Sequence, residues 1–369
     1  MKILQVIDCF ARIGGAEKLV LDLSIELKSM GNDIDILSII EPEQTKLEFK
    51  NTLEKYGINT YFLNSSNQLY SLQNILKFKN FLLNKSYDIV HVHLFPAQYF
   101  CAYGKKFAPN SKFIFTEHST DNKRRHYLIT RIIDKWTYKQ YDSIISISKK
   151  VEDGLYKLIN KENSVIIPNG IKLTEFYNAT PISMVNLIGC TNSKIKIITM
   201  CARFSKGKDY ITLFKTLKSL PPEVHIICIG DGELRGDCET YCQKEKIYNQ
   251  VHFLGTRDDV NRIFKASDAI VLSSEHEGFS LSMLEAMASG RPFTASRVNG
   301  IYDIIGDSID LFPYKDYNAL AKILLKMLYD NNYISQTVTK CLDFVKHYDI
   351  TYTAKKHMEL YNHLTSTII

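Results

Sequence analysis

The chain has 369 residues, of which 45% are hydrophobic and 23% charged, and its formal net charge is +6 at pH 7. This length is too great for one ordinary hydrophobic core and predicts two domains of roughly 150–200 residues each. The composition is that of an ordinary soluble protein; no apolar run reaches the ~18 residues of a membrane span, and the first residues form a strand pattern, which argues against a signal peptide.

The cysteines indicate a reducing compartment. Eight are present, with no Cys-x-x-Cys pair of the kind that binds a metal. Cys9, Cys201 and Cys228 fall within apolar strand patterns and are predicted to be buried, reduced thiols. This usage predicts a cytoplasmic protein.

Strand and helix patterns alternate through the first half of the chain. Short apolar segments predict strands at residues 2–10, 33–40, 58–63, 88–93, 112–118 and 143–148. Helical patterns separate most of them, at residues 69–84, 97–107, 125–140 and 149–159. Strands that alternate with helices predict a parallel, doubly wound sheet.

A second alternation of the same kind follows a break in the pattern. Residues 177–194 lose periodicity and gather Pro, Ser, Asn and Gly, which predicts a linker at 179–189. Further strands are expected at residues 195–202, 223–230, 251–255, 269–274 and 292–295, and further helices at 208–218, 233–247, 258–267, 281–289 and from 316 onward. Doubly wound domains bind ligands at the carboxyl ends of their strands, so the cleft between the two domains is the expected active site.

Gly14-Gly15 stands at the first strand-to-helix turn. Two glycines let the backbone approach a ligand closely, and the start of the helix favours a phosphate. The spacing is not GxGxxG, so no dinucleotide-binding fingerprint is present. A tight turn is the alternative explanation.

Arg203 and Lys208 lie between a strand end and the next helix. Cations at the start of a helix oppose its dipole, so they do not stabilise the helix. Arginine supplies a bidentate fork and lysine a point charge, which together suit a diphosphate. A solvated loop is the alternative.

The segment from Glu277 to Gly290 follows an apolar strand and opens a helix. The free amides and the dipole at the start of that helix favour an anion. Glu277 in the loop and Glu285 in the helix flank this point, and carboxylates accept hydrogen bonds from sugar hydroxyls. The segment therefore indicates a sugar-nucleotide site. The spacing of Ser282 and Glu285 also fits a capping box, in which Glu285 would only satisfy a backbone amide.

Several histidines and acidic residues are considered as possible metal ligands. His91 and His93 lie on one face of a strand, but no third ligand stands at a sensible spacing, so packing or substrate contact is favoured. His118 ends the next strand and is expected to point into the cleft. Asp33-Ile34-Asp35 resembles the metal-binding DxD of other sugar transferases, yet it begins a strand, and its acids are expected to face solvent. No metal site is predicted.

Residues 105–150 hold eleven Lys and Arg against four Asp and Glu. Lys123-Arg124-Arg125 stand beside an apolar helical stripe that includes Ile132 and Trp136. Such a pattern suits an anionic membrane surface, so residues 123–139 are a candidate for peripheral membrane contact. The commoner alternative is a helix that turns its apolar side to the core.

Taken in order, these motifs resemble those of the family-4 retaining glycosyltransferases of the GT-B fold, over nearly the whole chain. The resemblance rests on Gly14-Gly15-Ala16-Glu17, His118, Arg203 with Lys208, and Glu277 with Glu285. It extends to residues 165–170, 230–234, 251–255 and 285–292. One departure is Asn299-Gly300, where a second glycine is common in the family.

The resemblance implies that the second domain, residues 190–349, binds a nucleotide sugar. Arg203 and Lys208 would hold its diphosphate, and Glu285 would bind the ribose. Glu277 would contact the transferred sugar, assisted by the backbone amides of Gly278, Phe279 and Ser280.

The first domain would then comprise residues 1–178 and a last helix at 350–369 that crosses back to it. Gly14 and Gly15 would reach the phosphates, and His118 would lie beside the sugar. The expected catalytic residues are Glu277, His118, Gly15, Arg203 and Lys208.

The implied reaction is a retaining, metal-independent sugar transfer from a nucleotide sugar, UDP-linked in preference to GDP-linked, with no further cofactor. The acceptor would be a saccharide or a lipid-linked saccharide, as in bacterial surface polysaccharide synthesis. No nucleic-acid partner is expected. Two alternatives remain, a sugar-nucleotide 2-epimerase on the same scaffold and a non-catalytic nucleotide-sugar-binding subunit.

Overall fold

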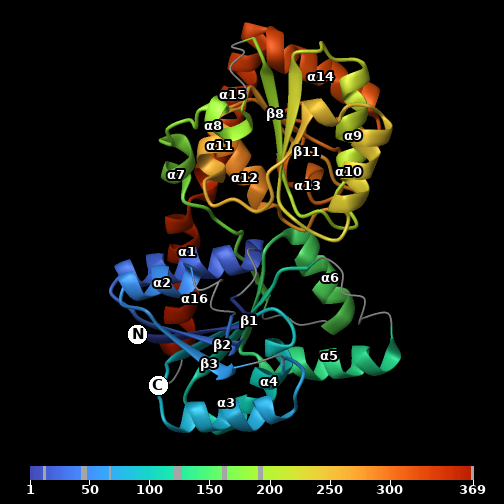
Figure 1. Cartoon of the computed structure of the whole chain (residues 1–369). Helices are drawn as coiled ribbons and strands as arrows, with labels where there is room; N and C mark the ends of the chain where they lie inside the picture. The colour runs from blue at the N-terminus through green and yellow to red at the C-terminus, as the bar shows by residue number, and fades with distance from the viewer. Residues whose placement is uncertain are drawn as a thin grey trace. The chain divides into compact units, whose positions relative to one another are not determined.

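The computed structural model describes residues 1–10, 14–42, 48–65, 68–119, 127–159, 164–189 and 194–366. The chain divides into two compact units, Met1–Gly170 with Ile350–Ile369, and Ile171–Asp349 (Figure 1). Each unit contains a parallel sheet with helices packed around it, as the alternating pattern predicts.

The first unit is built on a seven-stranded sheet in the order β3-β2-β1-β4-β5-β6-β7, with every pair parallel. Its strands are β1 (Lys2–Cys9), β2 (Asp33–Ile40), β3 (Asn59–Asn64), β4 (Ile89–His93), β5 (Lys112–Glu117), β6 (Ser143–Ser146) and β7 (Ser164–Ile166). Its helices are α1 (Gly15–Ser29), α2 (Glu48–Lys55), α3 (Gln73–Leu83), α4 (Ala97–Gly104), the short η2 (Lys105–Phe107), α5 (Leu128–Gln140), α6 (Lys149–Ile159) and α16 (Ile350–Ser366).

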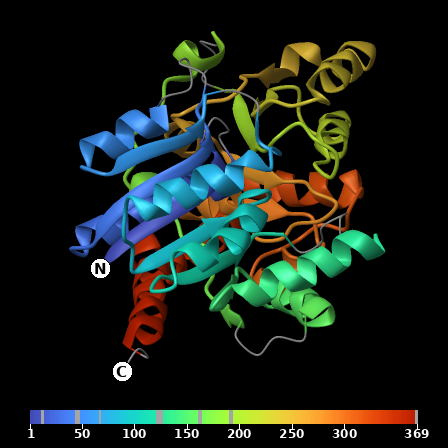
Figure 2. The ribbon, with the colours of Figure 1, turned by 90° about the horizontal axis from the view of Figure 1, so that it is seen from below.

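The last helix returns to the first unit, as predicted. Helix α16 packs along α1, and Figure 2 shows it in red beside the blue amino-terminal elements. His357 and Tyr361 of this helix are buried, and Asn32 Nδ2 lies 3.3 Å from Met358 Sδ. The first unit is therefore completed by a helix from the end of the chain.

The second unit is built on a five-stranded parallel sheet in the order β10-β9-β8-β11-β12. Its strands are β8 (Lys196–Cys201), β9 (Val224–Ile229), β10 (Val251–Phe253), β11 (Ala269–Leu272) and β12 (Phe293–Ala295). Its helices are α7 (Leu173–Tyr177), α8 (Met184–Ile188), α9 (Tyr210–Lys215), η4 (Thr216–Lys218), α10 (Arg235–Lys244), η5 (Tyr248–Gln250), α11 (Val260–Ala266), α12 (Leu281–Ala288), α13 (Tyr302–Ile305), α14 (Tyr317–Tyr329), α15 (Asn331–Val345) and η6 (Lys346–Tyr348).

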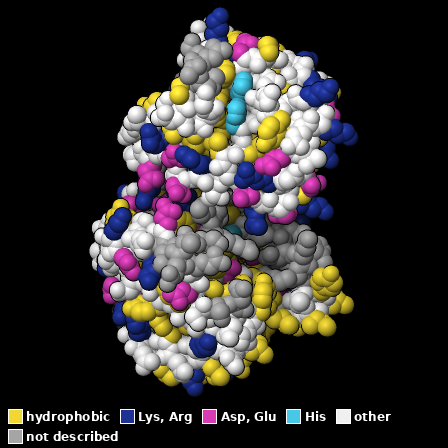
Figure 3. All heavy atoms as spheres, in the orientation of Figure 1, with side chains coloured by type: hydrophobic (Ala, Val, Ile, Leu, Met, Phe, Trp, Pro, Cys, Tyr) yellow, Lys and Arg dark blue, Asp and Glu magenta, His cyan; other side chains and the backbone are white. Residues whose placement is uncertain are grey.

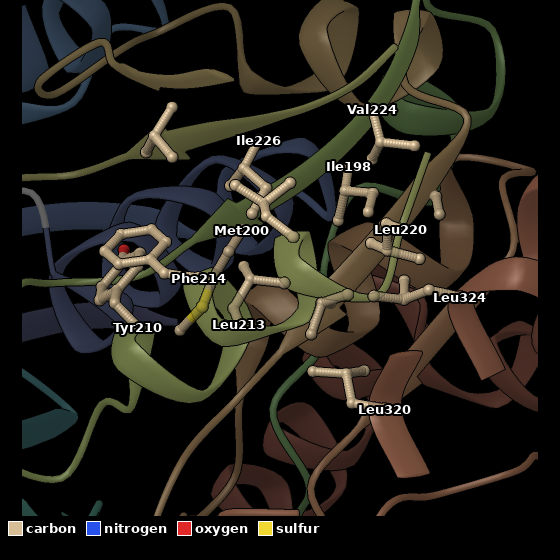
Figure 4. Packing of buried hydrophobic residues seen from close by; sticks show 14 of the residues in the cluster. Ile198, Met200, Tyr210, Leu213, Phe214, Leu220, Val224, Ile226, Leu320 and Leu324 are labelled. Carbon is tan, nitrogen blue, oxygen red and sulfur yellow. The ribbon is translucent and has the colours of Figure 1, made fainter. Parts of the chain in front are cut away.

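The core of the second unit packs one face of this sheet against α9 and α14. Met200, Ile226, Leu213 and Leu324 meet there, all fully buried (Figure 4). These side chains come from strands β8 and β9 and from the two helices, so the apolar patterns of four separate segments fill one core.

The predicted boundary between the domains is corrected by the structure. Residues 171–178, and the segment 179–189 expected to be a linker, belong to the second unit. Helix α11 holds them, because Lys265 Nζ donates to the Tyr177 carbonyl at 2.8 Å and Arg262 Nε donates to the Thr180 carbonyl at 3.3 Å. Helices α7 and α8 have only five residues each, too few to show a helical period in the sequence.

Two predictions about exposure are wrong in part. Asp33 is exposed, but Asp35 is buried, because Tyr87 donates to its Oδ2 at 2.7 Å and Asn59 donates to its Oδ1 at 2.9 Å. Among the cysteines, Cys228 is buried as expected, whereas Cys9 and Cys201 are only half-buried. In the part of the chain that the structure describes, no helix has both the length and the apolar character needed to cross a bilayer.

Candidate functional site

In the second unit, the loop between β8 and α9 is anchored by an aromatic pair. Phe204 is buried and stacks on Tyr210 with a ring-centroid distance of 4.0 Å. The anchor fixes the loop at the carboxyl end of β8 and leaves Arg203 and Lys206 exposed on either side of it. Arg203 forms no ion pair with any residue that the structure describes.

The turn after β9 is hydrogen-bonded to this loop through the backbone. Phe204 N donates to the Asp231 carbonyl at 3.0 Å, and Leu234 N donates to the Phe204 carbonyl at 3.0 Å. A Cβ atom at Gly232 would lie 2.3 Å from the Phe204 carbonyl oxygen, so only glycine fits. The glycine-rich turn at 230–232 therefore packs against the Arg203 loop.

The loops after β8 and β11 are joined by their backbones. Lys208 and Ser274 form an antiparallel bridge, and Glu275 N donates to the Gly207 carbonyl at 2.8 Å. Asp209 N also donates to the carbonyl of Ser273 at 2.9 Å. Strands β8 and β11 are neighbours in the sheet, so their loops meet at the same edge.

Lys208 and Glu277 form an ion pair at this junction. The side chains are 20% and 11% exposed, so the charges compensate each other in a partly shielded position. Ser274 Oγ donates to the same Glu277 oxygen at 2.7 Å. Ser274 was not predicted as a site residue; its only signal in the sequence is its place at the end of an apolar strand.

The backbone of Glu277 is held by the loop after β12. Glu277 N donates to the Asn299 carbonyl at 3.4 Å. Gly300 has φ +86°, and a Cβ atom there would lie 1.8 Å from the Glu277 carbonyl oxygen. A glycine at position 300 is thus required, and the residue at 299 contributes its carbonyl group.

The structure decides against the capping box proposed for Glu285. The N-cap of α12 is Ser280, whose hydroxyl accepts from Met283 N at 3.3 Å. Ser282 and Glu285 lie inside the helix, and Glu285 is 8% exposed. Glu285 is therefore not the partner of a helix cap.

The charges of Glu285 and Lys208 both influence the Cys201 thiol at the end of β8. Burial raises the pKa of the Cys201 thiol, the carboxylate of Glu285 raises it further, and the ammonium of Lys208 lowers it. Cys201 is the last residue of β8. One cation and two carboxylates, including Glu277, thus gather at the carboxyl ends of β8 and β11.

In the first unit, Gly14 and Gly15 lie at the amino terminus of α1. Gly14 is the N-cap in an extended conformation, and Gly15 is the first helical residue and is exposed. The carboxylate of Glu17 would lie 2.3 Å from a Cβ atom at Gly14, so a side chain there would displace it. Small residues keep the start of α1 accessible.

His118 follows β5 and contacts a second histidine. Its Nε2 lies 3.2 Å from Nδ1 of His93, and Nε2 of His93 lies 2.8 Å from Oε1 of Gln5. Burial and, to a smaller extent, the nearby His357 lower the pKa of His118 to about 4. His118 is therefore neutral at physiological pH.

The neighbouring His91 packs within the unit, in agreement with the favoured interpretation. Its Nδ1 lies 2.6 Å from the Tyr361 hydroxyl, and its Nε2 lies 2.7 Å from Thr116 Oγ1. Both ring nitrogens are thus engaged by hydrogen-bonding groups. No local pattern in the sequence connects residue 91 with residue 361.

The predicted site residues fall into one group in each unit. The second unit holds Arg203, Lys208, Glu277, Gly278, Phe279, Ser280 and Glu285. The first unit holds Gly14, Gly15 and His118. Both groups lie at the carboxyl ends of the strands of their own sheet, where doubly wound folds bind ligands.

Two family models match the chain. The model described as Glycosyltransferase Family 4 matches residues 13–175, and the model described as Glycosyl transferases group 1 matches residues 190–340. The matched ranges cover most of both units.

Individual proteins of known sequence or structure are similar over most of their length. N-acetyl-alpha-D-glucosaminyl L-malate synthase of Bacillus anthracis is 25% identical, with 89% of this chain and 88% of that protein covered. UDP-Gal:alpha-D-GlcNAc-diphosphoundecaprenol alpha-1,3-galactosyltransferase of Escherichia coli is 24% identical, with 70% and 71% covered. The crystal structure of Anabaena HepE in complex with UDP and glucose has a TM-score of 0.82 at 19% identity, with 98% of this chain and 99% of that chain covered.

Proposed function

The chain belongs to the family-4 glycosyltransferases of the GT-B fold, and on this premise we propose that it transfers a sugar with retention from a UDP- or GDP-sugar to a saccharide or lipid-linked saccharide. The observation that supports the proposal best is the pairing of Lys208 with Glu277 beside the start of α12. A cation, a helix amino terminus and two carboxylates suit a diphosphate that carries hydroxyl-rich groups at both ends.

In the proposed reaction, each charged group meets one part of the donor. Arg203 and Lys208 hold the diphosphate, and Glu285 accepts hydrogen bonds from the ribose hydroxyls. Glu277 accepts hydrogen bonds from the hydroxyls of the transferred sugar. The amides of Gly278, Phe279 and Ser280 and the dipole of α12 add to the positive potential around the phosphates.

The bond between the anomeric carbon and the phosphate oxygen breaks as that oxygen takes up negative charge. The cations stabilise this charge in the transition state, so a divalent ion is not part of the proposal. The acceptor oxygen forms its bond on the same face of the sugar, and its proton passes to the departing phosphate. In this scheme Gly15 lies near the phosphates and His118 near the sugar.

The experiment that tests the proposal follows both products. The purified protein is incubated with UDP- and GDP-sugars, with and without saccharide acceptors, in the presence and absence of EDTA. We expect release of nucleoside diphosphate that depends on a donor and is unaffected by EDTA, and a glycoside with the anomeric configuration of the donor by NMR. An inverted product, or loss of activity in EDTA, contradicts the mechanism. Epimerisation of the donor sugar without acceptor, or binding with no turnover, supports one of the alternatives instead.

We further propose that the acceptor is membrane-bound and that α5 contacts the membrane. Leu128, Ile129 and Ile132 on this helix are 78%, 75% and 68% exposed, whereas Asp134 and Thr137 are buried. The apolar side of α5 thus faces outward, which is the reverse of the core-facing alternative. Figure 3 shows hydrophobic side chains gathered where Figure 1 places α5.

Basic residues on the same helix suit an anionic lipid surface. Arg131, Lys135 and Lys139 alternate with its exposed apolar side chains, and Trp136 is half-exposed near its end. The predicted contact at 123–139 includes residues 123–126, which lie outside the described residues. The described part, from Tyr127 onward, carries the proposal.

A further inference from the structure

Two hydrogen-bonded groups of polar side chains lie between His118 and α16 in the first unit, His118–His93–Gln5 and Tyr361–His91–Thr116. The first group begins with the contact of His118 Nε2 with His93 Nδ1 at 3.2 Å and continues from His93 Nε2 to Gln5 Oε1 at 2.8 Å. Gln5 and His93 are both fully buried, on the adjacent strands β1 and β4. Two shielded side chains therefore stand behind the one histidine predicted to meet the sugar.

The second group includes Tyr361 of the last helix. Gln5 Nε2 forms no hydrogen bond with any described residue, so the link from Gln5 to the Tyr361 hydroxyl is a proximity of the two groups and not a hydrogen bond. Burial raises the pKa of Tyr361, and this contact with Gln5 opposes the rise. The Tyr361 hydroxyl in turn lies 2.6 Å from His91 Nδ1.

The chemistry of these groups sets the direction of the hydrogen bonds. Gln5 Oε1 only accepts, so His93 Nε2 must carry a proton. Burial lowers the pKa of His93, so its ring is neutral and its Nδ1 is an acceptor. His118 Nε2 must then donate to that nitrogen, which leaves Nδ1 of the neutral His118 ring without a proton.

The second group agrees with this direction. With the amide N–H of Gln5 turned to the Tyr361 oxygen, the Tyr361 hydroxyl donates to His91 Nδ1. His91 Nε2 then carries the proton and donates to Thr116 Oγ1 at 2.7 Å. Turning the Gln5 amide would reverse the donors and acceptors among Gln5, His93 and His118.

We infer that Gln5 and His93 are positioning residues that set the tautomer of His118, so that its Nδ1 offers a lone pair to a hydroxyl group of the bound sugar. Nδ1 of His118 makes no hydrogen bond with the residues that the structure describes, and the side chain is only half-buried. The opposite tautomer would present an N–H in its place and would meet a hydroxyl as a donor. This inference rests on the proposed function for the identity of the ligand, but not for the tautomer.

The tautomer is measured directly on the full chain by long-range ¹H–¹⁵N NMR of the histidine rings at neutral pH. The His118 signals are assigned by comparison with His118→Gln. We expect the proton of His118 on Nε2 and a bare Nδ1, and the same pattern for His93. A proton on Nδ1 of His118 in the unmodified protein overturns the inference, whatever the activity of the protein.

Two variants test the role of the first group. In Gln5→Met and His93→Phe we expect a mixture of His118 tautomers, together with a fall in kcat of roughly tenfold at little change in donor KM, as for the weakening of one neutral hydrogen bond in the transition state. Tyr361→Phe, which keeps the ring, is a milder variant that should shift the tautomers of His91 and His118 in case the others fold poorly. Unchanged His118 signals in all three variants would contradict the inference.

A matched control lies in the second unit. His225 Nδ1 and His252 Nε2 are 2.9 Å apart on neighbouring strands, a histidine pair with no connection to Gln5. His225→Gln should leave the His118 signals and kcat unchanged. If the tautomers behave as expected and no sugar transfer is found with any donor, the positioning role of Gln5 and His93 stands and the proposed function fails.

Discussion

Lys208 and Glu277 form an ion pair although 69 positions separate them along the chain. They meet because their loops follow the neighbouring strands β8 and β11 and are joined by the bridge between Lys208 and Ser274. In the free protein, the pair cancels two charges in a partly shielded position. On the proposed function, a bound diphosphate offers Lys208 a second anion and leaves Glu277 free to accept from sugar hydroxyls.

Lys208→Met tests whether the Lys208–Glu277 pair serves both to bind phosphate and to stabilise the fold. Loss of the cation removes the proposed phosphate contact, so we expect turnover to fall at least ~100-fold and the Kd for the nucleoside diphosphate to rise at least ~10-fold. Glu277 loses its partner, which should lower the free energy of unfolding by ~1–3 kcal/mol. The double variant Lys208→Met/Glu277→Gln should regain stability but not activity. Lys206→Met, on the exposed side of the same loop, is the control; an equal loss there would argue against a specific phosphate contact.

Glu285→Gln should weaken binding of the nucleoside part of the donor. A carboxylate accepts from two ribose hydroxyls, whereas an amide presents only one oxygen, so we expect the Kd for a nucleoside diphosphate to rise roughly tenfold. Isothermal titration calorimetry measures it. Glu275→Gln is the matched control, since Glu275 is exposed in the neighbouring loop. Similar affinities for both variants would remove Glu285 from the ribose site.

Gly300→Ala tests the contact that holds the Glu277 loop. The new Cβ atom would lie 1.8 Å from the Glu277 carbonyl oxygen at a φ of +86°, so the loop must move. We expect a loss of ~2 kcal/mol or more in stability and a large fall in activity. Gly236→Ala is the control, because a Cβ atom there meets nothing within 4 Å and the residue lies in α10. A Gly300→Ala protein as stable and active as the control would show that the close contact is not required.

Ile129→Glu/Ile132→Glu should abolish membrane contact through α5. Two carboxylates on the exposed apolar face would be repelled by anionic lipid, so co-sedimentation with phosphatidylglycerol-containing vesicles should be lost. The unmodified protein should bind these vesicles, release them at high salt, and bind pure phosphatidylcholine weakly. Leu325→Glu on α14, in the second unit, is the control. Vesicle binding by the double variant equal to that of the unmodified protein would show that this face of α5 does not contact the membrane.

His357 makes the stability of the first unit sensitive to acid. Burial lowers its pKa to about 4, although a hydrogen bond to the Thr353 carbonyl opposes the shift. The unfolded chain, with a histidine pKa near ~6.5, therefore binds more protons below that pH, and stability falls as the pH drops from about 6.5 toward 4. Between pH 7 and pH 5 this histidine should account for a loss of ~2 kcal/mol. His357→Gln should reduce the loss by that amount in urea unfolding, and the exposed His347→Gln should not.

The alternation of strands and helices could be predicted because each buried strand of a parallel sheet is a continuous apolar segment of the sequence. Residues 33–40, for example, are predicted and observed as a strand with the same bounds. Helices α7 and α8 could not be predicted, because each has only five residues and such a short segment shows no repeating helical pattern of apolar residues. Asp35 was misjudged because its burial depends on Tyr87, which approaches from a distant part of the chain.

In the candidate site, too, the residues with a local sequence pattern could be predicted, whereas contacts between distant parts of the chain could not. Lys208, Glu277 and His118 could be proposed as site residues because each follows a strand end, and a parallel sheet gathers its strand ends at one edge. Gln5 supports His93 from the adjacent strand β1, and Tyr361 reaches His91 because the last helix packs there. The return of that helix came from the family resemblance, whereas its contact with His91 had no signal in the sequence.

The return of α16 also sets an order of assembly during translation. All residues of the second unit leave the ribosome before α16 does, so that unit is able to close while the first still lacks Tyr361 and His357. Until the last helix arrives, His91 lacks the Tyr361 hydroxyl as its hydrogen-bonding partner. The domain that is made first is thus the one that is finished last.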